Sequence, residues 1–320
     1  MISVIIATHN GAHTLPRMLE ALALVHLPEQ GAEFIAVDNA STDDTYRILL
    51  KHTERLPLRA LTEPRAGKSF ALNRGIAEAS GDLLLFTDDD VVPEKTWLTA
   101  YAAAAKARRE VGLFAGQVRH DWEAPPPRWL ERLAAAGLSY AGTREGREEG
   151  PIAPNEVKGL NLMVRRDSLG PVRFCEDEGV NFTRAVASVG GEDTRFAREV
   201  LARGVASWFV PNACLRHIVR VHQIGIRPVF QRYVRIGGAI VLRNPDYYEG
   251  RAHVFGLPAV ELSYIARHTL RGLYRLTLRQ PETAARHMVN LALTFGKVRQ
   301  WRMLRRHVSR QENRSASDPV

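Results

Sequence analysis

Three consecutive aspartates, Asp88, Asp89 and Asp90, are the residues most able to do chemistry. They follow an apolar run that favours a buried strand. In extended backbone, residues two apart point the same way, so Asp88 and Asp90 can converge while Asp89 points elsewhere. So much negative charge is unfavourable unless a cation neutralises it. Oxygen ligands of this kind favour Mg²⁺ or Mn²⁺; a solvated acidic turn is the alternative interpretation.

Two later segments carry further candidates for the same site. Glu192 and Asp193 open a predicted helix over 194–202. An acidic pair there either compensates the helix dipole or is aimed into a site by the preceding glycines. His217 follows a predicted strand at 206–210. A lone histidine is usually structural, but beside a metal–carboxylate site it becomes a candidate ligand.

Polar residues also follow the first two predicted strands, in the segments THN (8–10) and DNASTD (38–43), where they suit a base and a ribose. Gly67-Lys68-Ser69 matches the end of a phosphate-binding P-loop. That motif needs a glycine five residues earlier, where Thr62 stands, so a P-loop is excluded.

The elements that must position these residues alternate between strand and helix over the first 120 residues. Predicted strands cover 2–7, 34–37, 58–61 and 83–87, and predicted helices cover 12–27, 43–52, 69–79 and 94–107. This order predicts an α/β fold with a mainly parallel sheet flanked by helices on both faces. Such sheets bind ligands at the carboxyl ends of their strands, where the polar residues above stand.

Composition is that of a folded protein. Of the 320 residues, 45% are apolar and 25% charged, which excludes a disordered chain. Two cysteines cannot make a disulfide framework, and no apolar run reaches the length of a spanning helix. Strand-like sequence starts directly after Met1 without a basic leader, so we expect no signal peptide and a cytoplasmic protein.

Charge is distributed unevenly. Residues 1–213 hold 25 Lys and Arg against 29 Asp and Glu, a net charge of −4, whereas residues 214–320 hold 19 against 6, a net charge of +13. A uniformly basic nucleic-acid binder would not show this asymmetry, so we expect no nucleic-acid partner.

The basic region contains an amphipathic pattern. An arginine recurs at every fourth position, at Arg267, Arg271, Arg275 and Arg279. A second set of residues, apolar except for one threonine, recurs at spacings of three and four: Leu262, Ile265, Thr269, Leu273 and Leu276. The pattern predicts a helix. Such a helix either packs on the body with a solvated basic face or lies on an anionic membrane surface.

The sequence between 120 and 156 has the composition of surface loops. Trp122 and Trp129 flank three prolines and could stack on a sugar or simply pack. The polar, glycine-rich segment 142–155 could be a lid that orders when a ligand binds.

The succession VIIATHN, VDNASTDDT, GKSFALNRGI, FTDDDV, GLNLMVRR, GGEDTRFA and a later histidine resembles the family 2 glycosyltransferases of GT-A fold. The resemblance implies a catalytic domain over residues 1–220 with acceptor loops at 120–156. A basic, mostly helical region with a polar flexible tail would follow over 221–320. It further implies transfer of a sugar from a nucleotide-diphosphate donor, most often a UDP-sugar, to an acceptor hydroxyl, usually with Mg²⁺ or Mn²⁺ and with inversion.

Family roles carry over onto matching positions. Asp193 matches the catalytic base, with Glu192 beside it. Asp88 and Asp90 match the DxD motif, so the expected metal ligands are Asp90, Asp88 and His217. The residues expected to line the nucleotide-sugar site are Thr8, Asn10, Asp38, Arg65, Lys68, Asn73, Asp88, Asp89 and Asn161.

Two other functions are alternatives to a glycosyltransferase. A nucleotidyltransferase on a similar sheet would carry a glycine-rich loop where the segment 8–10 stands. A non-catalytic nucleotide-binding scaffold, docking at membranes through its basic helices, would be expected to lack Asp90 or Asp193. For the transferase, we expect a saccharide or lipid-linked acceptor in cell-envelope or polysaccharide synthesis, with the enzyme in the cytoplasm, peripheral at the inner membrane surface.

Overall fold

The computed structural model describes residues 1–176, 191–244 and 246–315, with side chains up to residue 305. Gly190 and the predicted polar tail at 316–320 therefore lie outside the described residues. The chain divides into two compact units. The first comprises residues 1–125 and 134–221, and the second comprises residues 126–133 and 222–320.

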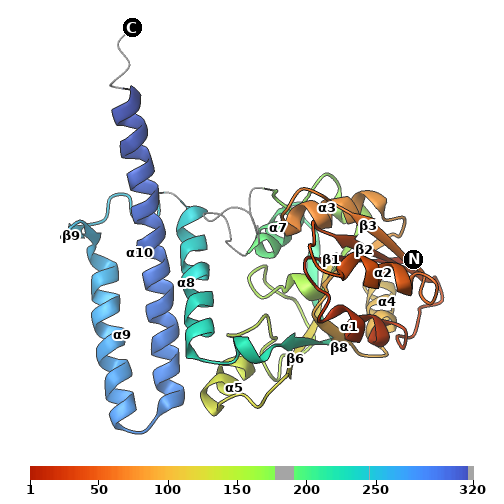
Figure 1. The fold of residues 1–320 in the computed structure, drawn as a ribbon, viewed down its shortest axis with the longest axis horizontal. Coiled ribbons are helices and arrows are strands. Elements are labelled where there is room, and N and C mark those ends of the chain that lie inside the picture. The colour runs from red at the N-terminus through yellow and green to blue at the C-terminus, as the bar shows by residue number, and fades with distance from the viewer. Residues whose placement is uncertain (177–190, 245, 316–320) are drawn as a thin grey trace. The chain divides into compact units, whose positions relative to one another are not determined.

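The first unit is built on an eight-stranded sheet with the order β3-β2-β1-β4-β7-β6-β8-β5 (Figure 1). Its first four strands are parallel: β1 (Ile2–Thr8), β2 (Ala32–Asp38), β3 (Leu58–Thr62) and β4 (Leu83–Asp88). Every residue of β1 is buried, as an apolar run covered on both faces should be. The predicted α/β class and parallel strand–helix alternation are confirmed.

The other half of the sheet is mixed. It contains β5 (Val91–Pro93), β6 (Val111–Trp122), β7 (Leu162–Arg165) and β8 (Ala206–Val219). β7 runs antiparallel to both β4 and β6, while β6 and β8 run parallel to each other. β5 pairs antiparallel with β8, so the chain just after the aspartate run lies beside the later histidine strand.

Helices cover both faces of the sheet. One apolar core combines Val4 and Ile6 of β1 with α1 (Leu15–Leu22), α2 (Thr45–His52) and α4 (Trp97–Ala107). The other combines Ile5 of β1 with α3 (Lys68–Glu78), α6 (Arg166–Leu169) and α7 (Glu192–Leu201). Alternate residues of β1 thus pack into two different cores. A shift of the strand by one residue would exchange the two faces, so this packing fixes the register of the strand.

The second unit is helical. It contains α8 (Ile226–Leu242), α9 (Ala259–Thr277) and α10 (Pro281–Ser315), a short sheet of β9 (His253–Val254) and β10 (Leu257–Pro258), and most of α5 (Arg128–Ala135). Val241, Tyr248 and Trp301 form its small aromatic core. In the described part of the chain, no helix combines the length and apolarity that crossing a membrane requires. Arg279 lies beyond the end of α9, so the predicted arginine stripe on this helix ends at Arg275.

Candidate active site

The strand ends of β1, β2 and β4 meet at one edge of the sheet. The register pairs Thr8 with Asp38 and Ala7 with Asp88. The polar residues that follow these strands are therefore neighbours in space, although 30 to 80 positions separate them in the sequence. A parallel sheet presents its ligand site at this edge.

Lys68, the first residue of α3, connects the two acidic motifs. Its Nζ lies 2.5 Å from Asp88 Oδ1. Burial alone would lower the pKa of Lys68, but the carboxylates of Asp88, Glu192 and Asp193 raise that pKa above its ordinary value. The ammonium therefore stays charged between the aspartate run and the acidic pair that opens α7.

Asp90 and His217 form a second polar contact in the site. Asp90 Oδ2 lies 3.1 Å from His217 Nε2, and His217 Nδ1 lies 2.7 Å from the carbonyl oxygen of Tyr140. Since a carbonyl can only accept, Nδ1 carries a proton and Nε2 is turned toward Asp90. Burial would raise the pKa of Asp90, but His217 and Lys68 hold that pKa below its ordinary value.

This pair fits a divalent cation. Asp90 Oδ1 is buried and accepts no hydrogen bond from any residue that the structure describes, so among these residues it lacks the compensation that a buried carboxylate oxygen needs. A carboxylate with an imidazole suits Mn²⁺, and Mg²⁺ commonly sits on one or two carboxylates with substrate phosphates. The described residues hold no cluster of three or more His, Cys, Asp or Glu side chains arranged for a metal. Asp88, also a predicted ligand, pairs with Lys68 instead.

Asp89 and Asp90 lie beyond the end of β4, so the alternation predicted for the run stops at Asp88, and Asp88 and Asp90 contact different partners, Lys68 and His217. Asp89 accepts a hydrogen bond from the Thr8 hydroxyl. Burial and the nearby carboxylates of Asp90 and Asp88 raise the pKa of Asp89 to about 7. The Thr8 and Asp89 side chains thus tie the end of β1 to the aspartate run, and in this structure their polar atoms face each other.

Asp193 is held by backbone amides. Its Oδ2 accepts from the Gly159 amide at 2.9 Å and its Oδ1 from the Thr194 amide at 2.9 Å. A Cβ at position 159 would lie 2.9 Å from Asp193 Cβ, so this approach needs glycine. Gly191 caps α7 with a φ of 114°, a conformation that other residues rarely adopt. Both glycines therefore fix the direction of the Asp193 carboxylate.

Glu192 lies beside Asp193 but is buried. Its Oε2 accepts from the Gly191 amide at 2.8 Å. Burial and repulsion from Asp193 raise the pKa of Glu192, while Lys68 opposes this rise. The acidic pair thus consists of one buried carboxyl and one that is half-buried and fixed by two amides.

Three predicted nucleotide-site residues stand around the strand ends. Asn10, with a φ of 51°, accepts from the Thr42 amide at 2.8 Å and so links the loops after β1 and β2. Asp38 is buried at the end of β2. Arg65 forms two hydrogen bonds with Glu63 and covers the Phe70 ring.

Two predicted contact residues serve the scaffold instead. Asn161 is fully buried: its Oδ1 accepts from Trp97 and Tyr101, and its Nδ2 donates to the carbonyls of Gln117 and Ala213. No polar atom of this side chain is left for a donor or an acceptor sugar. Asn73 makes a similar pair of 2.9 Å hydrogen bonds to the backbone of Phe174. The geometry gives no support to a ligand contact by either residue.

Several supporting groups escaped the sequence reasoning. Asn39 is buried, accepts from the Gly67 amide at 2.7 Å and donates to the carbonyls of Glu63 and Arg65, so it shapes the loop that delivers Lys68. The Tyr140 carbonyl and the Gly159 amide are main-chain groups and leave no signature in side-chain types. Asn39 could have been suspected, because it stands next to Asp38 at a strand end.

The expected acceptor loops are partly anchored. Phe209 of β8 donates its amide to Gly150 at 2.7 Å, and the Trp208 indole donates to Glu149 at 2.9 Å, so these contacts tie the proposed lid to the sheet. Trp122 stacks on His120 and meets the edge of Tyr140, with ring centroids 5.0 and 6.0 Å away.

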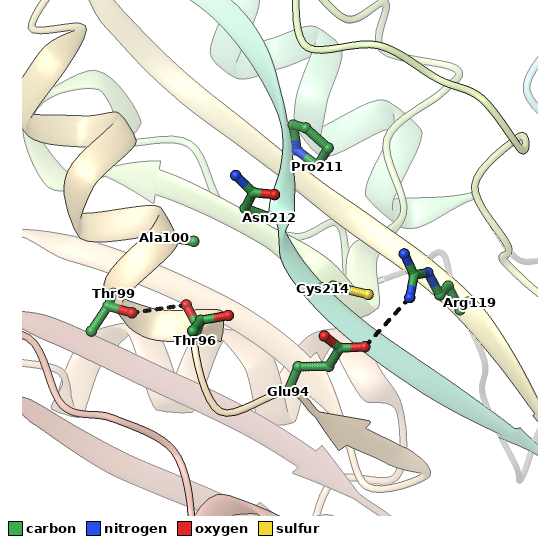
Figure 2. A pocket seen from close by; sticks show the side chains of 8 residues that line it. All are labelled: Glu94, Thr96, Thr99, Ala100, Arg119, Pro211, Asn212 and Cys214. Atoms are coloured by element: carbon green, nitrogen blue, oxygen red, sulfur yellow. Dashed lines mark hydrogen bonds and ion pairs between the residues drawn. The ribbon is translucent and has the colours of Figure 1, made fainter.

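An open pocket of about 400 Å³ lies apart from the carboxylates. Figure 2 shows its lining of Glu94, Thr96, Thr99, Ala100, Arg119, Pro211, Asn212 and Cys214. None of these is a predicted site residue. Glu94 and Arg119 face each other at 3.7 Å. Burial, together with Glu94, raises the pKa of the Cys214 thiol to about 12. The chemistry predicted from the sequence is therefore located at the strand ends rather than in this pocket.

Comparison with known proteins bears on this site. The model of the family described as "Glycosyl transferase family 2" matches residues 3–169. Glycosyltransferase AglE of Haloferax volcanii is 28% identical over 207 residues, which are 62% of this chain and 65% of AglE. The succinoglycan biosynthesis protein ExoM of Rhizobium meliloti is 25% identical over 226 residues, 70% of this chain and 69% of ExoM. The chain thus spans slightly less than two thirds of AglE.

Solved structures show the same fold at low identity. The mannosyltransferase PcManGT of Pyrobaculum calidifontis, in complex with GDP-Man and Mn²⁺, gives a TM-score of 0.58 at 21% identity, covering 92% of this chain and 86% of that one. Residues 1–349 of S. aureus TarS, in complex with UDP-GlcNAc, give a TM-score of 0.52 at 14% identity, covering 93% and 91%. The GT-A fold expected from the sequence is confirmed.

Proposed function

The chain belongs to glycosyl transferase family 2, and we propose that it is a glycosyltransferase that transfers a sugar from a nucleotide-diphosphate donor to an acceptor hydroxyl with inversion. One observation carries this proposal. Lys68 pairs with Asp88 of the aspartate run, and the carboxylates of the acidic pair that opens α7 lie near enough to help raise the pKa of this ammonium. A fixed cation between a phosphate-side motif and a base-side motif is what such a transfer requires.

The donor would bind across the strand ends. Thr8, Asn10, Asp38 and Arg65, which lie around these strand ends, would contact the base and ribose. Lys68 would then face the diphosphate, exchanging part of its contact with Asp88 for phosphate oxygens. We propose a UDP-sugar, since the TarS fragment with this fold binds UDP-GlcNAc; the GDP-Man complex of PcManGT makes a GDP-sugar the other donor to test.

Asp90 and His217 would hold the metal, Mn²⁺ or Mg²⁺. When bound, that ion supplies positive charge to a diphosphate leaving group. Tyr140 keeps His217 Nδ1 protonated, which leaves Nε2 as the available ligand atom. The unpartnered Asp90 Oδ1 supports this assignment.

Asp193 would act as the general base. Two backbone amides fix its carboxylate, and each carboxylate oxygen keeps a further lone pair for the acceptor hydroxyl. The hydroxyl passes its proton to Asp193 as its oxygen attacks the anomeric carbon opposite the leaving diphosphate. A single displacement needs one such base and no second carboxylate nucleophile, so the expected outcome is inversion.

For the acceptor, we propose a saccharide or lipid-linked saccharide of cell-envelope or polysaccharide synthesis, presented to a cytoplasmic enzyme at the inner membrane surface. Support comes from the names of similar proteins. ExoM is a succinoglycan biosynthesis protein, and TarS is a poly(ribitol-phosphate) β-N-acetylglucosaminyltransferase. Both names refer to a polymer, succinoglycan in one case and poly(ribitol-phosphate) in the other.

A panel of nucleotide sugars tests the proposal. Released nucleoside diphosphate is measured with Mn²⁺, with Mg²⁺ and with chelator; we expect release from one donor class and none with chelator. Asp90→Asn should abolish the metal-dependent part of donor binding, whereas Asp82→Asn, which changes an exposed acid just before β4 at the opposite end of that strand, should not. Pyrophosphate release from a nucleoside triphosphate and a sugar 1-phosphate would identify a nucleotidyltransferase. Nucleotide binding without turnover would identify a scaffold.

A further inference from the structure

The helix α9 exposes an unusual amount of apolar surface. Among the described residues, eight of the nineteen large hydrophobic side chains that are exposed fall between positions 254 and 278. Phe255, on the turn that leads into α9, is 95% exposed. Leu270, Leu273 and Tyr274 on α9 itself are 69%, 57% and 60% exposed. Their spacing of three and four places them on one face of the helix, here called the leucine face; Leu276, 54% exposed, stands three positions after Leu273 at the edge of that face.

A different face of α9 packs within the helical unit. Glu261 accepts from Lys297 of α10 at 3.2 Å, and His268 Nδ1 lies 3.0 Å from His287 Nδ1. Leu262 and Ile265 are half-buried on this packed side, whereas Leu273 and Leu276 are not. Figure 1 shows α9 running alongside α10. The face formed by Leu270, Leu273 and Tyr274 therefore stays exposed although the opposite side of α9 packs within the unit.

Cationic residues border the leucine face. Arg267 and Arg271 are exposed and stand one turn before Leu270 and Tyr274. The Arg267 guanidinium covers the Tyr264 ring at 4.4 Å. No Asp or Glu occurs between residues 262 and 281. The surface of α9 is thus apolar along one stripe and positive along the next, and the one acid of this helix, Glu261, is buried against Lys297.

We propose that α9 docks on an anionic lipid surface, lying in the plane of the membrane. Leu270, Leu273 and Tyr274 would enter the boundary between headgroups and acyl chains, and Arg267 and Arg271 would reach the lipid phosphates. At 19 residues α9 is about 28 Å long, enough for five turns of contact. Charge complementarity favours lipid over a second copy, since two such helices on a twofold axis would bring like charges together.

This docking deepens the proposal that the acceptor is presented at a membrane, and it is tested by lipid binding, separately from catalysis. The full chain is sedimented with vesicles of one part phosphatidylglycerol to two parts phosphatidylcholine, and with phosphatidylcholine alone. Binding to the anionic vesicles is expected. The double variant Leu270→Ser, Leu273→Ser should lower the partition coefficient about tenfold or more. The matched double variant Leu24→Ser, Leu50→Ser changes leucines 61% and 47% exposed in the other unit and should bind as wild type.

The arginines have a matched control as well. Arg267→Ala with Arg271→Ala should weaken binding to the anionic vesicles about thirtyfold, from about fivefold per arginine, and leave any binding to phosphatidylcholine unchanged. Arg55→Ala with Arg109→Ala removes the same charge from exposed positions of the first unit and should have little effect.

The depth to which α9 enters the lipid can be measured directly, so the test does not depend only on variants that lose vesicle binding. Leu273→Trp should show a blue-shifted emission with anionic vesicles and quenching by brominated acyl chains. No sedimentation at low salt, or no shift for Leu273→Trp, would overturn the proposal. So would a wild-type dimer that becomes monomeric in Leu270→Ser, Leu273→Ser, because the face would then be a contact between copies. The nucleoside diphosphate that each variant releases from the donor tests the catalytic proposal separately, whether or not the variant binds lipid.

Discussion

Replacing Lys68 by methionine removes a charge while keeping the length of the side chain. Lys68 Nζ lies 2.5 Å from Asp88 Oδ1, and Lys68 also faces the carboxylates of Glu192 and Asp193. The variant would leave these acids, with Asp89 and Asp90 nearby, without their fixed cation. We expect a less stable protein that depends more strongly on a divalent metal.

The magnitude follows from burial. The Lys68 and Asp88 side chains are only 21% and 24% exposed. Removing one partner of a buried ion pair costs about 3–5 kcal/mol. With the remaining solvent access, about 3 kcal/mol is expected, near the lower end. In a unit of this size that corresponds to a fall in melting temperature of roughly 6–12 °C. Mn²⁺ should recover more of this loss in the variant than it adds to wild type, because it supplies charge where the ammonium was.

Calorimetry with chelator and with Mn²⁺ measures both effects. Lys51→Met, at an exposed position on α2, is the matched control and should melt as wild type does. Equal melting temperatures for Lys68→Met and wild type with chelator would refute the reasoning. An equal gain from Mn²⁺ in both proteins would refute the link between Lys68 and the metal site.

Three further predictions concern other parts of the chain. Asn161→Ala should cost about 3 kcal/mol in denaturant unfolding, from a buried amide with four hydrogen bonds, with donor affinity unchanged; weakened donor binding in a well-folded variant would restore the ligand role. Because burial and Glu94 raise the pKa of Cys214 to about 12, alkylation at neutral pH should modify Cys175 and spare Cys214, as mass spectrometry can show. Burial and nearby arginines lower the pKa values of His268 and His287, so the folded state binds fewer protons than the unfolded state. The free energy of unfolding of the helical unit should therefore fall as pH drops below 6.5, and His268→Asn should flatten this dependence.

The parallel half of the sheet could be predicted because each strand is short, apolar and flanked by a helix. The run Ile2–Ala7, for example, is apolar throughout and is buried on both faces of the sheet, as a central strand of this kind should be. The mixed half could not. β6 spans Val111–Trp122, yet only its first half is an apolar run, and its long pairing with β8 joins segments about 100 residues apart. Such pairing is decided by tertiary packing, which leaves no local pattern.

In the site, residue types were predictable and partners were not. The aspartate run follows a parallel strand, where such a sheet binds ligands, so its place at the site could be inferred, whereas the acidic pair opens a helix and was assigned through the family resemblance. The contact between Lys68 and Asp88 depends on the direction of both side chains, which the spacing of residues in the sequence does not reveal. The same holds for Asn161, whose side chain uses its polar atoms in hydrogen bonds within the protein. On α9 the period established two faces but not which one packs, so the exposed leucines Leu273 and Leu276 became visible only in the structure.

The transfer rate of Asp193→Asn at saturating donor, with the donor dissociation constant measured on the same preparation, tests the central claim most directly. The amide keeps the shape of Asp193 but accepts no proton, so the rate should fall about a thousandfold while the dissociation constant stays close to that of wild type. A wild-type rate, or joint loss of rate and donor binding, would contradict the assignment of Asp193 as the base of this glycosyltransferase.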